Sequence, residues 1–123
     1  MTLKKVLFIS FSFLLITSPS AFAHTSLVTS NPARGSVILK LPSKITLTFE
    51  DSLLTLGKTA INRVVVTDPT GVVITSGVDV VKGAVVTDAF KSAHSARGKY
   101  NVSYRVSAVD GHIVTGKFTF TLK

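Results

Sequence analysis

Apolar and polar residues alternate strictly along three segments of this chain, residues 44–49, 100–106 and 114–122. The apolar positions are Ile45, Leu47 and Phe49 in the first segment, Tyr100, Val102, Tyr104 and Val106 in the second, and Val114, Phe118, Phe120 and Leu122 in the third. Side chains alternate between the two faces of a β-strand, so a period of two predicts half-buried antiparallel strands. We expect these apolar positions to form the core.

Shorter apolar segments are separated by residues that favour turns. Asp68-Pro69-Thr70-Gly71 suits a type I turn between residues 61–67 and 72–74, and Lys82-Gly83 suits a tighter hairpin. Residues 24–123 contain 16 Val, 5 Ile and 13 Thr, which are stiff β-branched residues that suit strands. Helical periodicity is weak except for a candidate turn over 52–56. The pattern predicts an all-β sandwich or small Greek-key barrel.

Residues 1–23 have the pattern of a secretory signal peptide. Lys4 and Lys5 form a basic start, residues 6–16 are apolar, and Ala21-Phe22-Ala23 matches a small-x-small cleavage site. The alternative is an uncleaved anchor, but the apolar segment is shorter than the ~20 residues of a membrane-spanning helix. We expect cleavage between Ala23 and His24. The remaining residues, 24–123, would be one domain, exported to the periplasm or secreted, with His24 at a free amino terminus.

Composition narrows the possible functions. The chain has 14 Lys+Arg and 6 Asp+Glu, but the basic residues are scattered, which argues against nucleic acid as a partner. Nothing after Ala23 is long and apolar enough for stable membrane insertion. There is no Cys, and the only Met is Met1, so the expected exported chain has no sulfur ligand for a metal.

Three features contain possible metal ligands. The amine and imidazole of a terminal His24 could close a chelate ring on one metal ion. Asp110-Gly111-His112 places a carboxylate and an imidazole at positions i and i+2, which point the same way in an extended segment. Glu50-Asp51 follows the first alternating segment. Each feature has an ordinary alternative: an incidental first residue, a surface Asp-Gly turn, and two solvated carboxylates at a strand end.

These donors together favour Cu(II). Nitrogen and oxygen ligands suit Cu(II), which also leads the divalent metals in the Irving–Williams order, whereas Cu(I) prefers sulfur. No motif for nucleophilic catalysis is present. We interpret the remaining histidine, His94, as a surface residue of a polar loop.

Two ends of residues 24–123 resemble the CopC family of periplasmic copper-binding proteins. Residues 24–36, HTSLVTSNPARGS, resemble H-x-x-L-x-x-S-x-P-A-x-G-S, and residues 42–49 resemble P-x-x-I-x-L-x-F. Residues 98–116 resemble G-x-Y-x-V-x-[WY]-R-x-x-S-x-D-G-H-x-x-x-G.

The resemblance implies a seven-stranded Greek-key β-barrel with an immunoglobulin-like appearance. It implies one Cu(II) per chain, held by the amine and imidazole of His24 with Asp110 and His112. A carboxylate of an F-x-E pattern approaches the metal in the family; here Glu50 follows Phe49 directly and Asp51 takes the third place, so either residue could fill that role. The absence of Met after Met1 resembles the members that bind Cu(II) only.

We therefore expect a non-enzymatic copper carrier or buffer in copper homeostasis or resistance. Its partners would be the copper ion and a membrane copper importer of the CopD type, or another exported protein. One alternative is a copper monooxygenase that also uses an amino-terminal histidine, although 100 residues without Cys leave little room for a substrate face. A second alternative is a metal-free β-sandwich interaction module.

Overall fold

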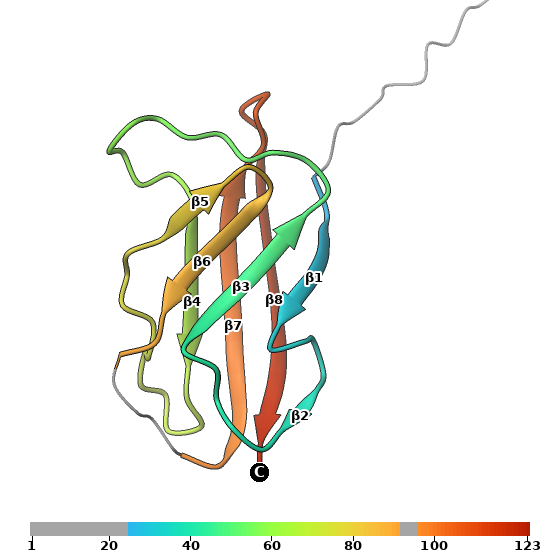
Figure 1. Cartoon of the computed structure of the whole chain (residues 1–123), viewed down its shortest axis with the longest axis vertical. Helices are drawn as coiled ribbons and strands as arrows, with labels where there is room; N and C mark the ends of the chain where they lie inside the picture. The colour runs from blue at the N-terminus through green and yellow to red at the C-terminus, as the bar shows by residue number, and fades with distance from the viewer. Residues whose placement is uncertain (1–24, 92–95) are drawn as a thin grey trace, which may run out of the picture.

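Two four-stranded sheets pack face to face in the computed structural model, which describes residues 25–91 and 96–123 (Figure 1). The predicted leader 1–23, His24 and His94 lie outside the described residues. The strands are β1 (Leu27–Asn31), β2 (Val37–Ile38), β3 (Lys44–Phe49), β4 (Arg63–Thr67), β5 (Val80–Lys82), β6 (Val85–Ala89), β7 (Gly98–Ser107) and β8 (Ile113–Leu122).

The first sheet has the order β1-β3-β6-β5 and the second the order β2-β8-β7-β4. All these neighbours are antiparallel except β2 and β8, which are parallel. The chain passes repeatedly between the sheets, as a Greek-key sandwich requires, and the described residues contain no helix. The all-β sandwich is confirmed. The described part of the chain has eight strands instead of seven because Val37–Ile38 pairs with β8 as a strand of two residues.

The alternating apolar residues form the core between the two sheets. Ile45 and Leu47 are fully buried in β3, as are Tyr100 and Val106 in β7. The predicted faces are therefore correct, and only Val114, near the start of β8, is partly exposed. Burial of these side chains removes apolar surface from water, which is the main favourable contribution to folding.

The turn predictions are largely confirmed. Gly71 N–H donates to the Asp68 carbonyl at 3.0 Å, as expected for the 68–71 turn. The β5–β6 turn lies one residue later than predicted, at Gly83–Ala84, because Lys82 pairs with Val85. The candidate helical turn over 52–56 is wrong: Leu53 forms a β-bridge with Ala108 instead.

Strands β7 and β8 form a hairpin that spans the sandwich and ends in the turn that contains Asp110 (Figure 1). Gly116 of β8 lies opposite Tyr104 of β7. A Cβ atom at position 116 would overlap the hydroxyl end of that ring. The glycine thus lets Tyr104 lie edge-on against Phe49, with ring centroids 5.4 Å apart, and join the two sheets.

Candidate metal centre

The β7–β8 turn is built from hydrogen bonds that leave its polar side chains exposed. Ala108 N–H donates to the His112 carbonyl at 2.9 Å, and Gly111 N–H donates to the Ala108 carbonyl at 2.9 Å. Gly111 has a φ of 89°, a conformation that favours glycine. Asp110 and His112 are therefore held on either side of a tight turn at the end of the sandwich.

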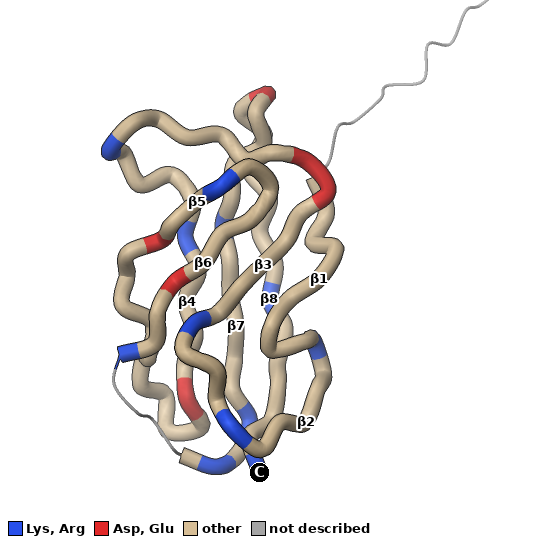
Figure 2. Tube along the Cα trace, in the orientation of Figure 1, with Lys and Arg blue, Asp and Glu red and all other residues tan. Residues whose placement is uncertain are grey.

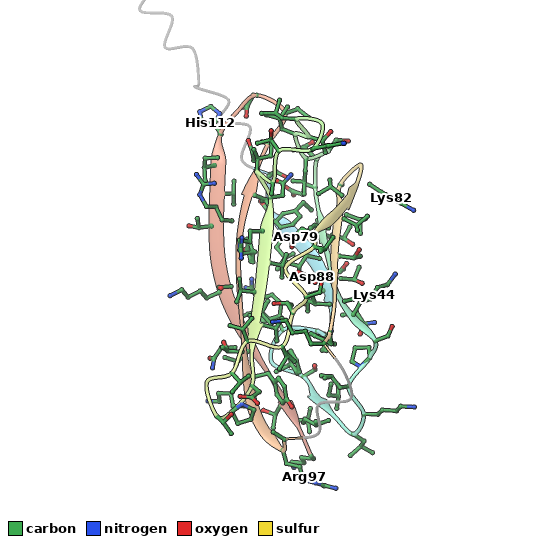
Figure 3. All side chains as sticks on the ribbon, turned by 90° about the vertical axis from the view of Figure 1, so that its left-hand side faces the viewer. Lys44, Asp79, Lys82, Asp88, Arg97 and His112 are labelled. Carbon is green, nitrogen blue, oxygen red and sulfur yellow. The ribbon has the colours of Figure 1, made fainter. Side chains whose placement is uncertain are left out.

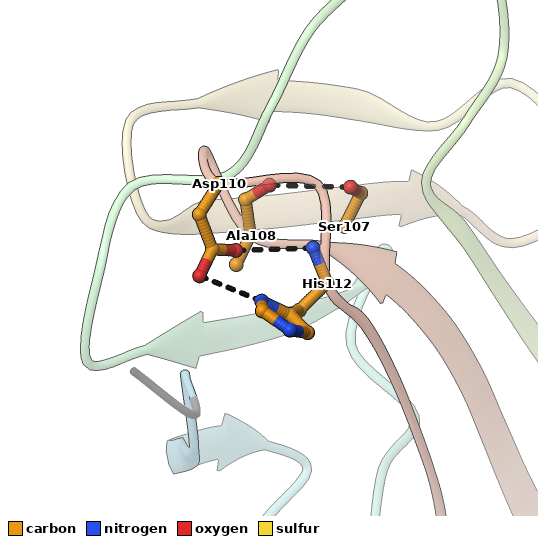
Figure 4. A network of polar contacts seen from close by, with 4 residues as sticks. All are labelled: Ser107, Ala108, Asp110 and His112. Atoms are coloured by element: carbon orange, nitrogen blue, oxygen red, sulfur yellow. Dashed lines mark hydrogen bonds and ion pairs between the residues drawn. The ribbon is translucent and has the colours of Figure 1, made fainter. Parts of the chain in front are cut away.

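The carboxylate of Asp110 makes two hydrogen bonds to His112 (Figure 4). Its Oδ1 accepts from the His112 backbone N–H at 3.0 Å, and its Oδ2 lies 2.7 Å from His112 Nδ1. The backbone bond first, and the side-chain bond second, lower the pKa of the Asp110 carboxyl. An ionised Asp110 therefore favours the proton on Nδ1, which leaves Nε2 of His112 as the nitrogen with an open lone pair.

The same end of the molecule holds the first described residues of the chain. Thr25 is only 1% exposed, and its hydroxyl accepts a hydrogen bond from Asp51 N–H at 3.2 Å. Glu50 N–H donates to the Ser26 carbonyl at 2.9 Å. Residues 25–26 are thus attached to the backbone of Glu50 and Asp51, whose side chains are exposed.

The segment after Asp51 connects this region to the β7–β8 turn. Leu53 bridges to Ala108, and Leu54 N–H donates to the Ser107 carbonyl at 2.9 Å. Asn62, which is 4% exposed, donates to the Leu54 carbonyl at 2.7 Å and accepts from Ser107 N–H at 2.9 Å. Hydrogen bonds and short stretches of backbone together therefore link the first described residues to the Asp110–His112 turn.

The structure brings some of the predicted site residues together. Asp110 and His112 are in direct contact, and Glu50 and Asp51 lie at the same end of the sandwich on the neighbouring segment (Figure 1). His24 and His94 lie outside the described residues. Within residues 25–91 and 96–123, no three His, Asp or Glu side chains are close enough to hold a metal ion.

No feature of the sequence predicted a role for Thr25 or Asn62. Both side chains are buried and hydrogen-bonded to the segments that carry the candidate ligands. A single Thr or Asn has no distinctive spacing, and Asp51 and Ser107 lie 26 and 45 residues from Thr25 and Asn62. No local signal could have identified either residue.

The Asp110–His112 pair fits a divalent transition metal. One imidazole nitrogen and carboxylate oxygens are borderline and hard donors, and a histidine oriented by a carboxylate is a common metal ligand. The His112 side chain is 61% exposed, so an ion could reach it from solvent. No helix in the described ranges is long and apolar enough to cross a bilayer.

The family model described as the CopC domain matches residues 27–123. The crystal structure of CopC from Methylosinus trichosporium OB3b is 29% identical, with a TM-score of 0.67 over 81% of this chain and 94% of that chain. PcoC, a methionine-rich copper resistance protein from Escherichia coli, shares the fold at 23% identity and a TM-score of 0.66, over 82% of this chain and 100% of that chain. No curated protein matches.

Proposed function

Because this chain belongs to the CopC family, we propose that it is an exported, non-enzymatic protein that carries one Cu(II) ion. The ion would be held by the amine and imidazole of His24 together with Asp110 and His112. Copper is the cargo of such a protein, which would buffer or deliver it in the periplasm. A membrane importer of the CopD type would be one recipient.

The observation that carries the proposal is the Asp110–His112 contact at the end of the β7–β8 hairpin. It leaves Nε2 of His112 open to solvent, with the Asp110 carboxylate hydrogen-bonded to Nδ1 of the same ring. The hydrogen bond between Thr25 and Asp51 supports His24 as a ligand. His24 is joined covalently to Thr25, and their Cα atoms are ~3.8 Å apart. Cleavage after Ala23 would release the amine that the site needs.

The donor set favours Cu(II) over Cu(I). The ligands are amine, imidazole and carboxylate, and the only sulfur in the chain is in Met1, inside the proposed leader. A protein that cycled copper between both states would need ligands for each. We therefore expect ascorbate to release the copper to a moderate Cu(I) chelator.

A titration of the processed protein with Cu(II), in competition with a chelator of known affinity, tests this function. We expect one tightly bound ion per chain and no change in the β-sheet circular dichroism spectrum. Assays with reductant and chitin or cellulose should yield no oxidised sugars, which separates a carrier from a copper monooxygenase. Failure to bind Cu(II) would leave the metal-free interaction module as the better function.

A further inference from the structure

The end of the sandwich opposite the candidate metal centre carries exposed apolar and basic side chains together. We call this group the basic tip, and it consists of Val37, Leu39, Lys40, Arg97, Lys99 and Lys123. Strand pairing brings the tip together from three segments, because Val37 pairs with Thr121 and Thr121 pairs with Lys99. Lys123 N–H donates to the Ile38 carbonyl at 2.9 Å. Figure 3 shows His112 and Arg97 at opposite ends of the long axis.

Two apolar side chains of the basic tip are exposed to an unusual degree. Leu39 is 83% exposed, the highest value among the large apolar residues described as exposed, and Val37 is 56% exposed. Neither side chain is covered by the part of the chain that the structure describes, residues 25–91 and 96–123. Lys40 directly follows Leu39, so an apolar and a charged side chain leave the same bend.

The exposed charged side chains of the basic tip are all positive. Lys40, Arg97, Lys99 and Lys123 are all exposed there, and Figure 2 shows basic residues gathered at the end marked C. Asp68, on the turn beside Gly98, is 2% exposed and accepts hydrogen bonds from the Thr70 and Val72 N–H groups of its own turn. A terminal carboxylate on Lys123 would offset one positive charge and leave a surplus.

We propose that the basic tip docks this protein on an anionic membrane surface. Basic side chains near such a surface each strengthen binding roughly fivefold, and a few exposed apolar side chains entering the headgroup region add to it. A stable protein partner needs about 800 Å² of complementary surface on each side, whereas the tip offers only two exposed large apolar side chains. The small apolar area and the four exposed cations favour a lipid surface.

Docking through the basic tip would set the orientation of the molecule. The Asp110–His112 turn lies at the opposite end of the long axis, so it would face away from the bilayer (Figure 3). Copper in the aqueous compartment would then reach the candidate centre without obstruction. The contact is peripheral and needs no membrane-spanning segment.

Vesicle sedimentation with protein purified from periplasmic extracts tests the proposal. We expect binding to mixed phosphatidylglycerol and phosphatidylcholine vesicles, none to phosphatidylcholine alone, and a decline as salt rises. Charge reversal of two tip residues, Lys40→Glu with Lys99→Glu, should weaken binding on the order of 100-fold. Leu39→Ser should weaken it about tenfold through lost apolar burial.

A matched control separates the basic tip from overall charge. Lys44→Glu with Lys82→Glu makes the same change in net charge on the first sheet, where both side chains point away from the tip (Figure 3). This variant should keep binding within about fivefold of the unmodified protein. Equal losses in the two double variants, or no binding to phosphatidylglycerol vesicles, would overturn the proposal. Unchanged vesicle binding in the tip variant would also overturn it, and would favour an acidic protein partner for these cations.

Discussion

Thr25 and Asp51 are 26 residues apart in the chain, yet the Thr25 hydroxyl accepts a hydrogen bond from the Asp51 backbone N–H at 3.2 Å. Thr25 is the first described residue and is almost completely buried. Together with the bond from Glu50 N–H to the Ser26 carbonyl, this contact attaches the amino-terminal end of the domain to the segment that carries Glu50 and Asp51. In the proposed copper site, it would determine where His24 enters.

We expect Thr25→Val to lower Cu(II) affinity without removing a ligand. Valine has a similar shape but no hydroxyl, so Asp51 N–H loses its acceptor, at a cost to stability of about 1–3 kcal/mol. A less firmly held Thr25 should weaken copper binding roughly tenfold, as changes around metal ligands do. Chelator competition and thermal unfolding measure the two effects. Thr29→Val, on the exposed side of β1, is the matched control and should change neither.

Asp110 and His112 should differ in their contributions to binding. His112→Ala removes a ligand and should weaken Cu(II) binding more than 100-fold, beyond the 10–100-fold typical of residues around the ligands. Asp110→Asn keeps an oxygen acceptor for the His112 N–H but loses the negative charge next to Nδ1. We expect an intermediate loss and a changed copper spectrum. His94→Ala should leave affinity unchanged, and an equal loss in that variant would argue against the Asp110–His112 site.

One extra residue before His24 should break the proposed chelate. A Gly added there converts the His24 amine into an amide, which does not titrate near neutrality and coordinates poorly. The variant should fold normally, with the same unfolding temperature, and should lose at least about 10–100-fold in Cu(II) affinity. If the extended protein binds Cu(II) as tightly as the processed one, the amino-terminal ligand is wrong. The extended protein should still bind anionic vesicles through the basic tip, so the two proposals can fail independently.

The carboxylates of Glu50 and Asp51 should tune the copper site. Glu50→Ala or Asp51→Ala should alter the copper spectrum or the pH dependence of binding, with a loss no greater than about 10–100-fold. The residue with the larger spectral change is the one that approaches the metal. Complete loss of binding in either variant would make that residue a direct ligand. Spectra of both variants, recorded at equal copper occupancy, make the comparison.

Asp79 should make stability depend on pH. Burial raises the pKa of this carboxyl, although its Oδ1 accepts a hydrogen bond from Val64 N–H at 2.9 Å. Between the usual value of about 3.9 and the raised pKa, the folded state binds more protons than the unfolded state. The free energy of unfolding should therefore fall as pH rises through this window, by less than about 1 kcal/mol because Asp79 is partly exposed to solvent.

Asp79→Asn tests the pH effect because it keeps an oxygen for Val64 but cannot ionise. The variant should match or exceed the stability of the unmodified protein near neutrality, and the difference should vanish at low pH. Denaturant unfolding between pH 3 and 7 measures it. A larger advantage of the variant at low pH than at neutral pH would contradict the raised pKa.

The sequence alone determined most of the strands, their faces and the family, but not β1 or β2. Ile45, Leu47 and Tyr100 were assigned to the core because the two-residue period of a strand is a local property, readable from neighbours. Asp110 and His112 were also selected locally, since they are two residues apart. The prediction was wrong where the sequence shows no clear two-residue period. At residues 52–56, Leu53 forms a bridge to Ala108 in place of the expected helical turn.

Only the tertiary structure decided how the distant parts meet. The hydrogen bonds of Thr25 to Asp51 and of Asn62 to Leu54 and Ser107 depend on the order of strands in two sheets. The basic tip likewise joins Leu39 to Lys99 only through the pairing of β2, β8 and β7. These contacts reflect long-range packing, in which the free energy of burying the core selects one arrangement of strands. The sequence pattern of a single segment does not predict which strands it pairs with.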